Sequence, residues 1–106
     1  MGTRALIHVK EEGKTIVTIY RHYDGSPLHL GRDILNIIGD NSISNGIATQ
    51  AFNGMGCFAA MLIKGLKQDI GNVYIYKPNA KDVGEEFVYT ISQIDGKIDV
   101  HTHEVY

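Results

Sequence analysis

The stretch that decides the fold is residues 4–22, RALIHVKEEGKTIVTIYRH. Residues 4–10 and residues 15–22 are both rich in aliphatic and β-branched side chains, which favour strands. Between them, Glu11-Glu12-Gly13-Lys14 has the composition of a hairpin turn. The pattern therefore predicts an antiparallel hairpin, and Asp24-Gly25-Ser26-Pro27 follows it as a strand-ending turn.

A first helix is expected directly after this turn. Ser26 is a suitable N-cap, and Pro27 fits the first helical position because the N–H that proline lacks has no helical partner there. Gly39 offers a C-terminal stop. The apolar stripe that predicts the helix consists of Leu30, Ile34, Ile37 and Ile38.

A second helix is predicted over residues 57–67, CFAAMLIKGLK, with Asn53 as a possible cap upstream. Residues 40–56 are polar and rich in glycine, and we expect a long loop there. The second helix is apolar on nearly all sides, which indicates burial on more than one side. Because one sheet covers only one side of a helix, this pattern favours a homo-oligomer.

Three further strands are expected in the rest of the chain, over residues 73–76, 86–92 and 97–104, and Asp95-Gly96 is a type I′ turn signal between the last two. The predicted order is ββ-α-α-βββ. It indicates a single α+β domain over residues 1–106, with an antiparallel sheet of about five strands and two helices packed on one face.

Composition limits the partners. The chain has 106 residues, 43% of them hydrophobic, and a formal net charge of −2, with only three arginines and scattered lysines. A nucleic-acid polymer is an unlikely partner for such a surface, whereas a small anion needs only one or two guanidinium groups. No apolar run approaches the roughly 20 residues of a membrane span, and no leader is recognised. With a single cysteine, Cys57, the sequence predicts a cytoplasmic protein.

Metal and catalytic sites are not predicted. His101 and His103 lie two residues apart on an expected strand and could share a metal, but no third ligand is identifiable, and two surface histidines are the simpler interpretation. Cys57 begins a helix but has apolar neighbours, which favours a buried inert thiol. No catalytic triad or paired-carboxylate motif is present, and we expect neither catalysis nor a cofactor.

Two segments have the composition of a ligand site. Residues 20–27, YRHYDGSP, combine a guanidinium, aromatic rings and a helix start, which together suit a phosphate and a base. The structural alternative is an ordinary strand-to-helix corner. Residues 51–56, AFNGMG, form a Gly-rich approach to the second helix but lack the lysine and hydroxyl of a P-loop. The structural alternative there is a tight loop packed on the helix.

Four stretches carry a resemblance that spans nearly the whole chain: residues 2–7 (GTRALI), 19–27 (IYRHYDGSP), 52–56 (FNGMG) and 71–76 (GNVYIY). They resemble small bacteriophage proteins, most closely the first type of Thoeris anti-defence protein. The resemblance implies a sponge that binds cyclic ADP-ribose isomers made by an infected host's TIR-domain enzyme and withholds them without cleavage. It also implies dimers or hexamers in the host bacterial cytoplasm, and some hexamers also hold cyclic oligonucleotides at separate sites.

Under this resemblance, chemistry and motif position select the candidate ligand-binding residues, which are Arg4, Arg21, Tyr23, Asp24, Phe52, Asn53 and Phe87. No arginine follows Arg32, so a phosphate contact from the C-terminal half must use lysine or backbone. Two other functions stay open. One is a protein-interaction module that docks on a host enzyme, and the other is a small nucleotide hydrolase with His22 and Asp24 as acid–base partners.

Overall fold

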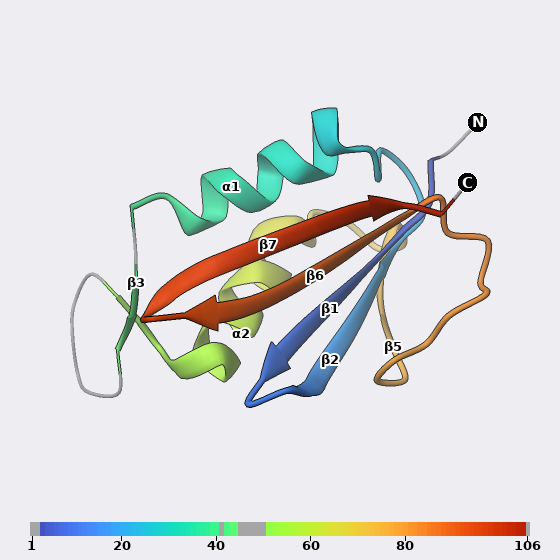
Figure 1. Ribbon diagram of the computed structural model, residues 1–106. Coiled ribbons are helices and arrows are strands. Elements are labelled where there is room, and N and C mark those ends of the chain that lie inside the picture. Colours follow the sequence, from blue (N-terminus) through green and yellow to red (C-terminus); the bar gives the residue numbers. More distant parts are fainter. Residues whose placement is uncertain (1–2, 41, 45–50, 106) are drawn as a thin grey trace.

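The computed structural model describes residues 3–40, 42–44 and 51–105 (Figure 1). A five-stranded sheet dominates it, with the strand order β5-β2-β1-β6-β7. The predicted α+β class, the number of strands in this sheet and the pair of helices are confirmed. No helix in the described ranges has the length and apolar character needed to cross a bilayer. The strands of the sheet are β1 (Ala5–Glu11), β2 (Lys14–Arg21), β5 (Val73–Tyr76), β6 (Phe87–Ile94) and β7 (Lys97–Glu104).

The sheet is mixed, and here the sequence expectation was wrong in one respect. The β1–β2, β2–β5 and β6–β7 pairs are antiparallel as predicted, but β1 and β6 are parallel, with Ala5 opposite Phe87. The reason is the connection after β5, which leaves one edge of the sheet and returns beside β1 in the direction of β1. Residues 77–86, which make this crossover, carry no periodic pattern that reveals it.

Both predicted hairpin turns are present. Glu12 and Gly13 have φ values of 52° and 80°, and Asp95 and Gly96 have φ values of 52° and 79°. Positive φ at both central residues is the signature of a type I′ turn, whose twist matches that of the flanking strands.

The first helical segment begins after Ser26 as expected, but its first turn, η1 (Pro27–Gly31), is π-helical and continues into α1 (Arg32–Ile38). Gly39, with a φ of 55°, ends α1. The Ser26 side chain makes no capping hydrogen bond.

The second helix, α2 (Gly54–Leu66), follows Asn53 and begins three residues earlier than predicted. The segment expected to be a loop contains β3 (Ser42–Ser44) and β4 (Ala51–Asn53), which pair in parallel. Residue 41 and residues 45–50 of that predicted loop lie outside the described part of the chain.

The core lies between one face of the sheet and the two helices. Alternate residues of β1 point toward it, and Leu30 and Ile34 from one helical segment meet Phe58 and Leu62 from the other. The helices approach closely, because a Cβ at Gly65 would lie 2.6 Å from the Ile37 side chain. The buried side of α2 thus has partners within the chain, from the sheet, α1 and β4, whereas Met61 on the same helix is 43% exposed.

The other face of the sheet is crossed by residues 77–86. The backbone N–H of Asn79 donates to Thr18 Oγ1 at 3.0 Å, and Thr18 Oγ1 also lies 2.8 Å from His8 Nδ1. Leu6 and Thr18 are fully buried on this side. The crossover therefore shields the second face of the two central strands.

Candidate functional site

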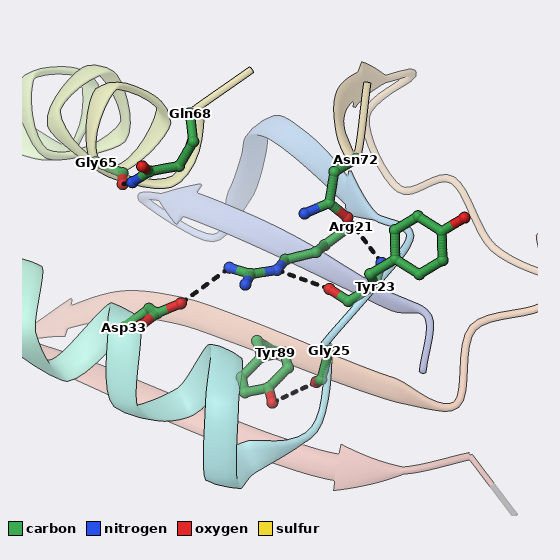
Figure 2. A network of polar contacts seen from close by, with 8 residues as sticks. All are labelled: Arg21, Tyr23, Gly25, Asp33, Gly65, Gln68, Asn72 and Tyr89. Atoms are coloured by element: carbon green, nitrogen blue, oxygen red, sulfur yellow. Dashed lines mark hydrogen bonds and ion pairs between the residues drawn. The ribbon is translucent and has the colours of Figure 1, made fainter. Parts of the chain in front are cut away.

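Arg21 is the last residue of β2, and strand alternation places its side chain on the helix-covered face with Ile19. It is only 8% exposed, and a buried charge needs partners. Its Nε donates to Tyr23 O at 2.9 Å, and its Nη1 donates to Asp33 Oδ2 on α1 at 3.1 Å (Figure 2). The guanidinium is thus fixed between the strand end and the helix.

The remaining guanidinium nitrogen, Nη2, has no hydrogen-bond partner among the described residues, and no buried side-chain nitrogen or oxygen there is left without one. Arg21 also lines a pocket of about 360 Å³ between α1, the end of α2 and the turn before β5. Its lining residues are Arg21, Asp33, Asn36, Ile37, Gly65, Leu66, Gln68 and Asn72.

The pocket offers donors and acceptors side by side. Asn72 Oδ1 accepts the Tyr23 N–H at 2.7 Å, which leaves the Asn72 NH₂ group for other partners. Gln68 Nε2 donates weakly to Gly65 O at 3.4 Å, which leaves its Oε1 as an acceptor. Asn36 is exposed on α1. Such a wall suits a polar ligand with an anionic group and hydroxyl or ring-nitrogen groups, and its volume lies within the range of small-molecule sites.

The turn that presents Asn72 is held from two sides. Asn72 has a φ of 63°, and its carbonyl accepts the His22 N–H at 2.8 Å. Lys67 Nζ donates to Gly71 O at 2.8 Å and to Val73 O at 2.9 Å. The lysine is therefore committed to the backbone of the turn, and Arg21 is the cation that lines the pocket.

Of the other predicted residues, Tyr23 lies beside this site. Its ring is 53% exposed and meets His22 edge-on at 4.5 Å. Asp24 is exposed and adopts a φ of 57°, and it serves the turn between β2 and η1. His22 Nδ1 lies 2.7 Å from Tyr20 OH, and no hydrogen bond joins His22 to Asp24 in the described structure.

Arg4 and Phe87 lie at the junction of β1 and β6 and do not line the pocket. The Arg4 carbonyl accepts N–H groups from Glu86 at 2.8 Å and from Phe87 at 3.3 Å. The Phe87 side chain is half-buried against the core. The exposed Arg4 guanidinium is close to Gly84 and Tyr20: burial raises the pKa of Tyr20, and the Arg4 charge opposes that rise.

Phe52 and Asn53 lie at the opposite end of the hairpin from Arg21. Phe52 is 5% exposed and packs edge-on against Phe58 at 5.2 Å, so its ring is a core residue and not an accessible stacking surface. The start of α2 is met by Glu11, whose Oε2 accepts the Met55 N–H at 3.3 Å. The two ends of β1 are about 20 Å apart, so the two segments predicted as one site are separated.

Other titratable side chains lie outside the pocket lining. Tyr89 OH donates to Gly25 O at 2.7 Å, and burial raises the pKa of Tyr89 to about 12. His101 and His103 are exposed on β7, and Cys57 is a half-buried free thiol. Within the described residues, no three or more His, Cys, Asp or Glu side chains gather as potential metal ligands.

Among the polar residues that line the pocket, Arg21 is one of the predicted ligand-binding residues, whereas Asp33, Asn36 and Gln68 are not. These are polar residues on helices or just after them, where nothing in the local pattern distinguishes them from ordinary surface residues. A buried arginine at a strand end requires an acidic partner, which was the one available signal for Asp33.

No protein-family model, curated protein or solved structure matches this chain.

Proposed function

We propose that this protein binds a small anionic nucleotide, of the cyclic ADP-ribose class that the sequence resemblance implies, and sequesters it without cleaving it. In that role it would be a phage anti-defence protein that blocks Thoeris immunity. The observation that supports this most directly is that the Arg21 guanidinium, fixed by two hydrogen bonds, lines a pocket together with Asp33 and the amide side chains of Asn36, Gln68 and Asn72.

The recognition follows from the groups in the pocket. A ligand phosphate binds the Nη2 side of Arg21, and it can also take the place of Asp33, whose side chain is 47% exposed against 10% for Arg21. The amide groups of Asn36, Gln68 and Asn72 bind ribose hydroxyls or base nitrogens. Tyr23 is half-exposed and lies outside the pocket lining.

Sequestration fits the pocket better than hydrolysis. The hydrolase alternative needs His22 and Asp24 to act together, but His22 is bonded to Tyr20 and Asp24 lies in solvent. The one carboxylate that lines the pocket, Asp33, is ion-paired with Arg21, and such a pocket supplies affinity through an ion pair and amides.

The test is thermal unfolding of the purified protein with cyclic ADP-ribose isomers and with cyclic di- and trinucleotides. A ligand that binds only the folded state adds about 2.7 kcal/mol at a hundred times its Kd, which raises the midpoint by several degrees. The ligand released on denaturation should be chemically intact. New products would instead support the hydrolase, and no shift with any compound would favour docking on a host protein.

A charge introduced into the pocket sharpens this test. We expect Asn36→Asp to weaken ligand binding by tenfold or more, because a carboxylate near Arg21 repels an anion and competes for the guanidinium. The matched control is Gln93→Glu, which adds the same charge at an exposed position of β6 outside the pocket lining. Equal affinities of the two variants would place the ligand elsewhere. Arg21→Ala is a poorer probe, because it also removes two structural hydrogen bonds.

A further inference from the structure

His8 lies in the middle of β1, on the sheet face that the crossover of residues 77–86 covers. Its side chain is half-buried, and its Nδ1 lies 2.8 Å from Oγ1 of Thr18, the residue opposite it on β2. Histidine is the side chain whose charge ordinarily changes near neutral pH. His8 does not line the pocket, so the proposed ligand site gives it no role.

Thr18 connects His8 to the crossover. Its Oγ1 accepts the Asn79 N–H at 3.0 Å, and its side chain is fully buried. A threonine hydroxyl has one hydrogen to donate, and a buried donor is seldom left without an acceptor. Among the described residues, the partners of Thr18 Oγ1 are Asn79 and His8, and the Asn79 N–H can only donate. The hydroxyl therefore donates to Nδ1 of neutral His8, whose own hydrogen is on Nε2.

Protonation of His8 reverses this arrangement. Nδ1 then carries a hydrogen and can only donate, so the Thr18 hydroxyl loses its acceptor. Two N–H donors, from His8 and Asn79, compete for one oxygen, while the hydroxyl hydrogen is left unbonded in a buried position. A proton on His8 therefore opposes the contact between the sheet and Asn79.

The charges around His8 set the direction of this effect. Burial, and next the charge of Lys10 on the same strand, lower the pKa of His8, whereas Glu85 on the crossover opposes the shift. The residue beside His8 on β6 is the uncharged Thr90. The folded arrangement thus favours neutral His8, and proton uptake favours an arrangement in which the ring is better solvated.

The crossover is held firmly at its ends and lightly in its middle. At one end β5 pairs with β2, and at the other the Glu86 N–H donates to the backbone of β1 at 2.8 Å. The buried Glu85 carboxylate also accepts two N–H groups of the crossover, at 2.8 and 3.1 Å. In the middle, residues 77–79 are exposed, and the second bond to Asn79 comes from the Thr15 hydroxyl at the surface.

We propose that His8, Thr18 and Asn79 form a pH-sensitive latch: neutral His8 holds the middle of the crossover on the sheet, and protonated His8 releases residues 77–81 while the sheet and helices stay folded. Release uncovers the second face of the two central strands around Leu6 and Thr18, which are fully buried when the latch is closed. The latch shares no residue with the pocket lining and is independent of the proposed ligand.

The test is amide nitrogen relaxation by NMR at about pH 7.5 and about pH 5, on either side of the ordinary pKa of histidine. Glu85 stays ionised at both values because, although its burial acts the other way, N–H groups hold its pKa below 4.5. The order parameters of residues 77–81 should fall from about 0.85 to below about 0.6 at the lower pH. Those of α2 should stay at the rigid value. A crossover that stays rigid at both pH values, or an α2 that loosens with it, overturns the latch.

Two variants assign the effect to the latch residues. His8→Asn keeps a side-chain acceptor near the Nδ1 position and cannot be protonated, so the crossover should stay ordered at both pH values. Thr18→Val removes the hydroxyl with little change of shape, so residues 77–81 should be mobile at both. His101→Asn, an exposed change on β7, is the control and should behave as the native protein. Release that persists in His8→Asn, or a crossover still ordered in Thr18→Val, overturns the proposal.

Discussion

At the scale of single residues, Gly25 occupies a close approach between two segments of the chain. Its N–H donates to Thr3 O at 2.8 Å, and its carbonyl accepts the Tyr89 hydroxyl at 2.7 Å. A Cβ at this position would lie 2.7 Å from both the Ala5 Cβ and the Thr3 carbonyl oxygen. We therefore expect Gly25→Ala to lower the free energy of unfolding by about 1–3 kcal/mol, measured by urea denaturation.

Gly56 provides the matched control for this substitution. It lies in the first turn of α2, and a Cβ there meets nothing within 4 Å. Gly56→Ala should raise the free energy of unfolding by about 0.5–1 kcal/mol, because alanine loses less conformational entropy in a helix. If both glycines respond alike, the close packing around Gly25 is not what constrains it.

The residue scale is also where sequence prediction of the site was weakest. A guanidinium beside a turn suits a phosphate, which favours Arg21, and Arg21 lines a pocket. Composition favours Phe52 equally, but Phe52 is a core residue. Whether a side chain reaches a pocket or the core depends on which face of its strand packs against the rest of the molecule. The Phe52 side chain packs against Phe58, and no local sequence pattern predicts this contact.

At the scale of elements, the start of α2 is stabilised by a residue from a strand. The Glu11 carboxylate accepts the Met55 N–H at 3.3 Å and lies at the positive end of the helix dipole. We expect Glu11→Ala to lower the free energy of unfolding by about 1 kcal/mol, and Glu11→Gln by less, because the amide oxygen still accepts the hydrogen bond. The measurement is chemical denaturation at low and at high salt.

The salt dependence distinguishes the helix contact from a general effect of charge. Salt screens the interaction with the dipole, so the difference between Glu11→Ala and Glu11→Gln should change as ionic strength rises. Glu104→Ala removes the same charge from an exposed position on β7 and should have little effect on stability. A comparable loss in both alanine variants would argue against a role at the helix start.

Elements were the scale at which the sequence was most informative. All five strands of the large sheet and both helices were found from periodicity and turn residues, because those features act over a few neighbouring residues. The parallel pairing of β1 with β6 was not, since strand order depends on where a patternless crossover leads. The β3–β4 pair was missed for a related reason, because each strand has only three residues and a polar setting.

At the scale of the whole molecule, the free energy of unfolding should fall in two separate pH ranges on acidification, one set by His8 and one by Glu85. Burial, with Lys10 next in effect, lowers the pKa of His8 from 6.5, while Glu85 opposes that shift. The folded state therefore favours neutral His8, and the unfolded chain binds more protons as pH falls below 6.5. Burial alone would raise the pKa of Glu85, but N–H groups from Asp82, Val83 and its own backbone lower it. The contribution of ionised Glu85 to the free energy of unfolding is therefore present above pH 4.5 and is lost as the pH falls below this value.

The measurement is the thermal midpoint as a function of pH for the native protein and for His8→Gln. The native midpoint should drop below pH 6.5, where protonation also disturbs the hydrogen bond between His8 and Thr18. The variant should keep a flat midpoint in that window and fall only in the lower one. His101→Gln, an exposed change on β7, is the control and should follow the native curve.

The parallel pairing of β1 with β6 also sets the order in which the molecule can acquire its structure. The hairpin of β1 and β2 can close as soon as it is synthesised, but the strand that flanks β1 on its other side begins at Phe87. Until that segment leaves the ribosome, one edge of β1 has no backbone partner. A topology with such distant contacts folds slowly for its size. The nascent chain therefore passes through a stage in which the central strand of its sheet is open to aggregation or to chaperones.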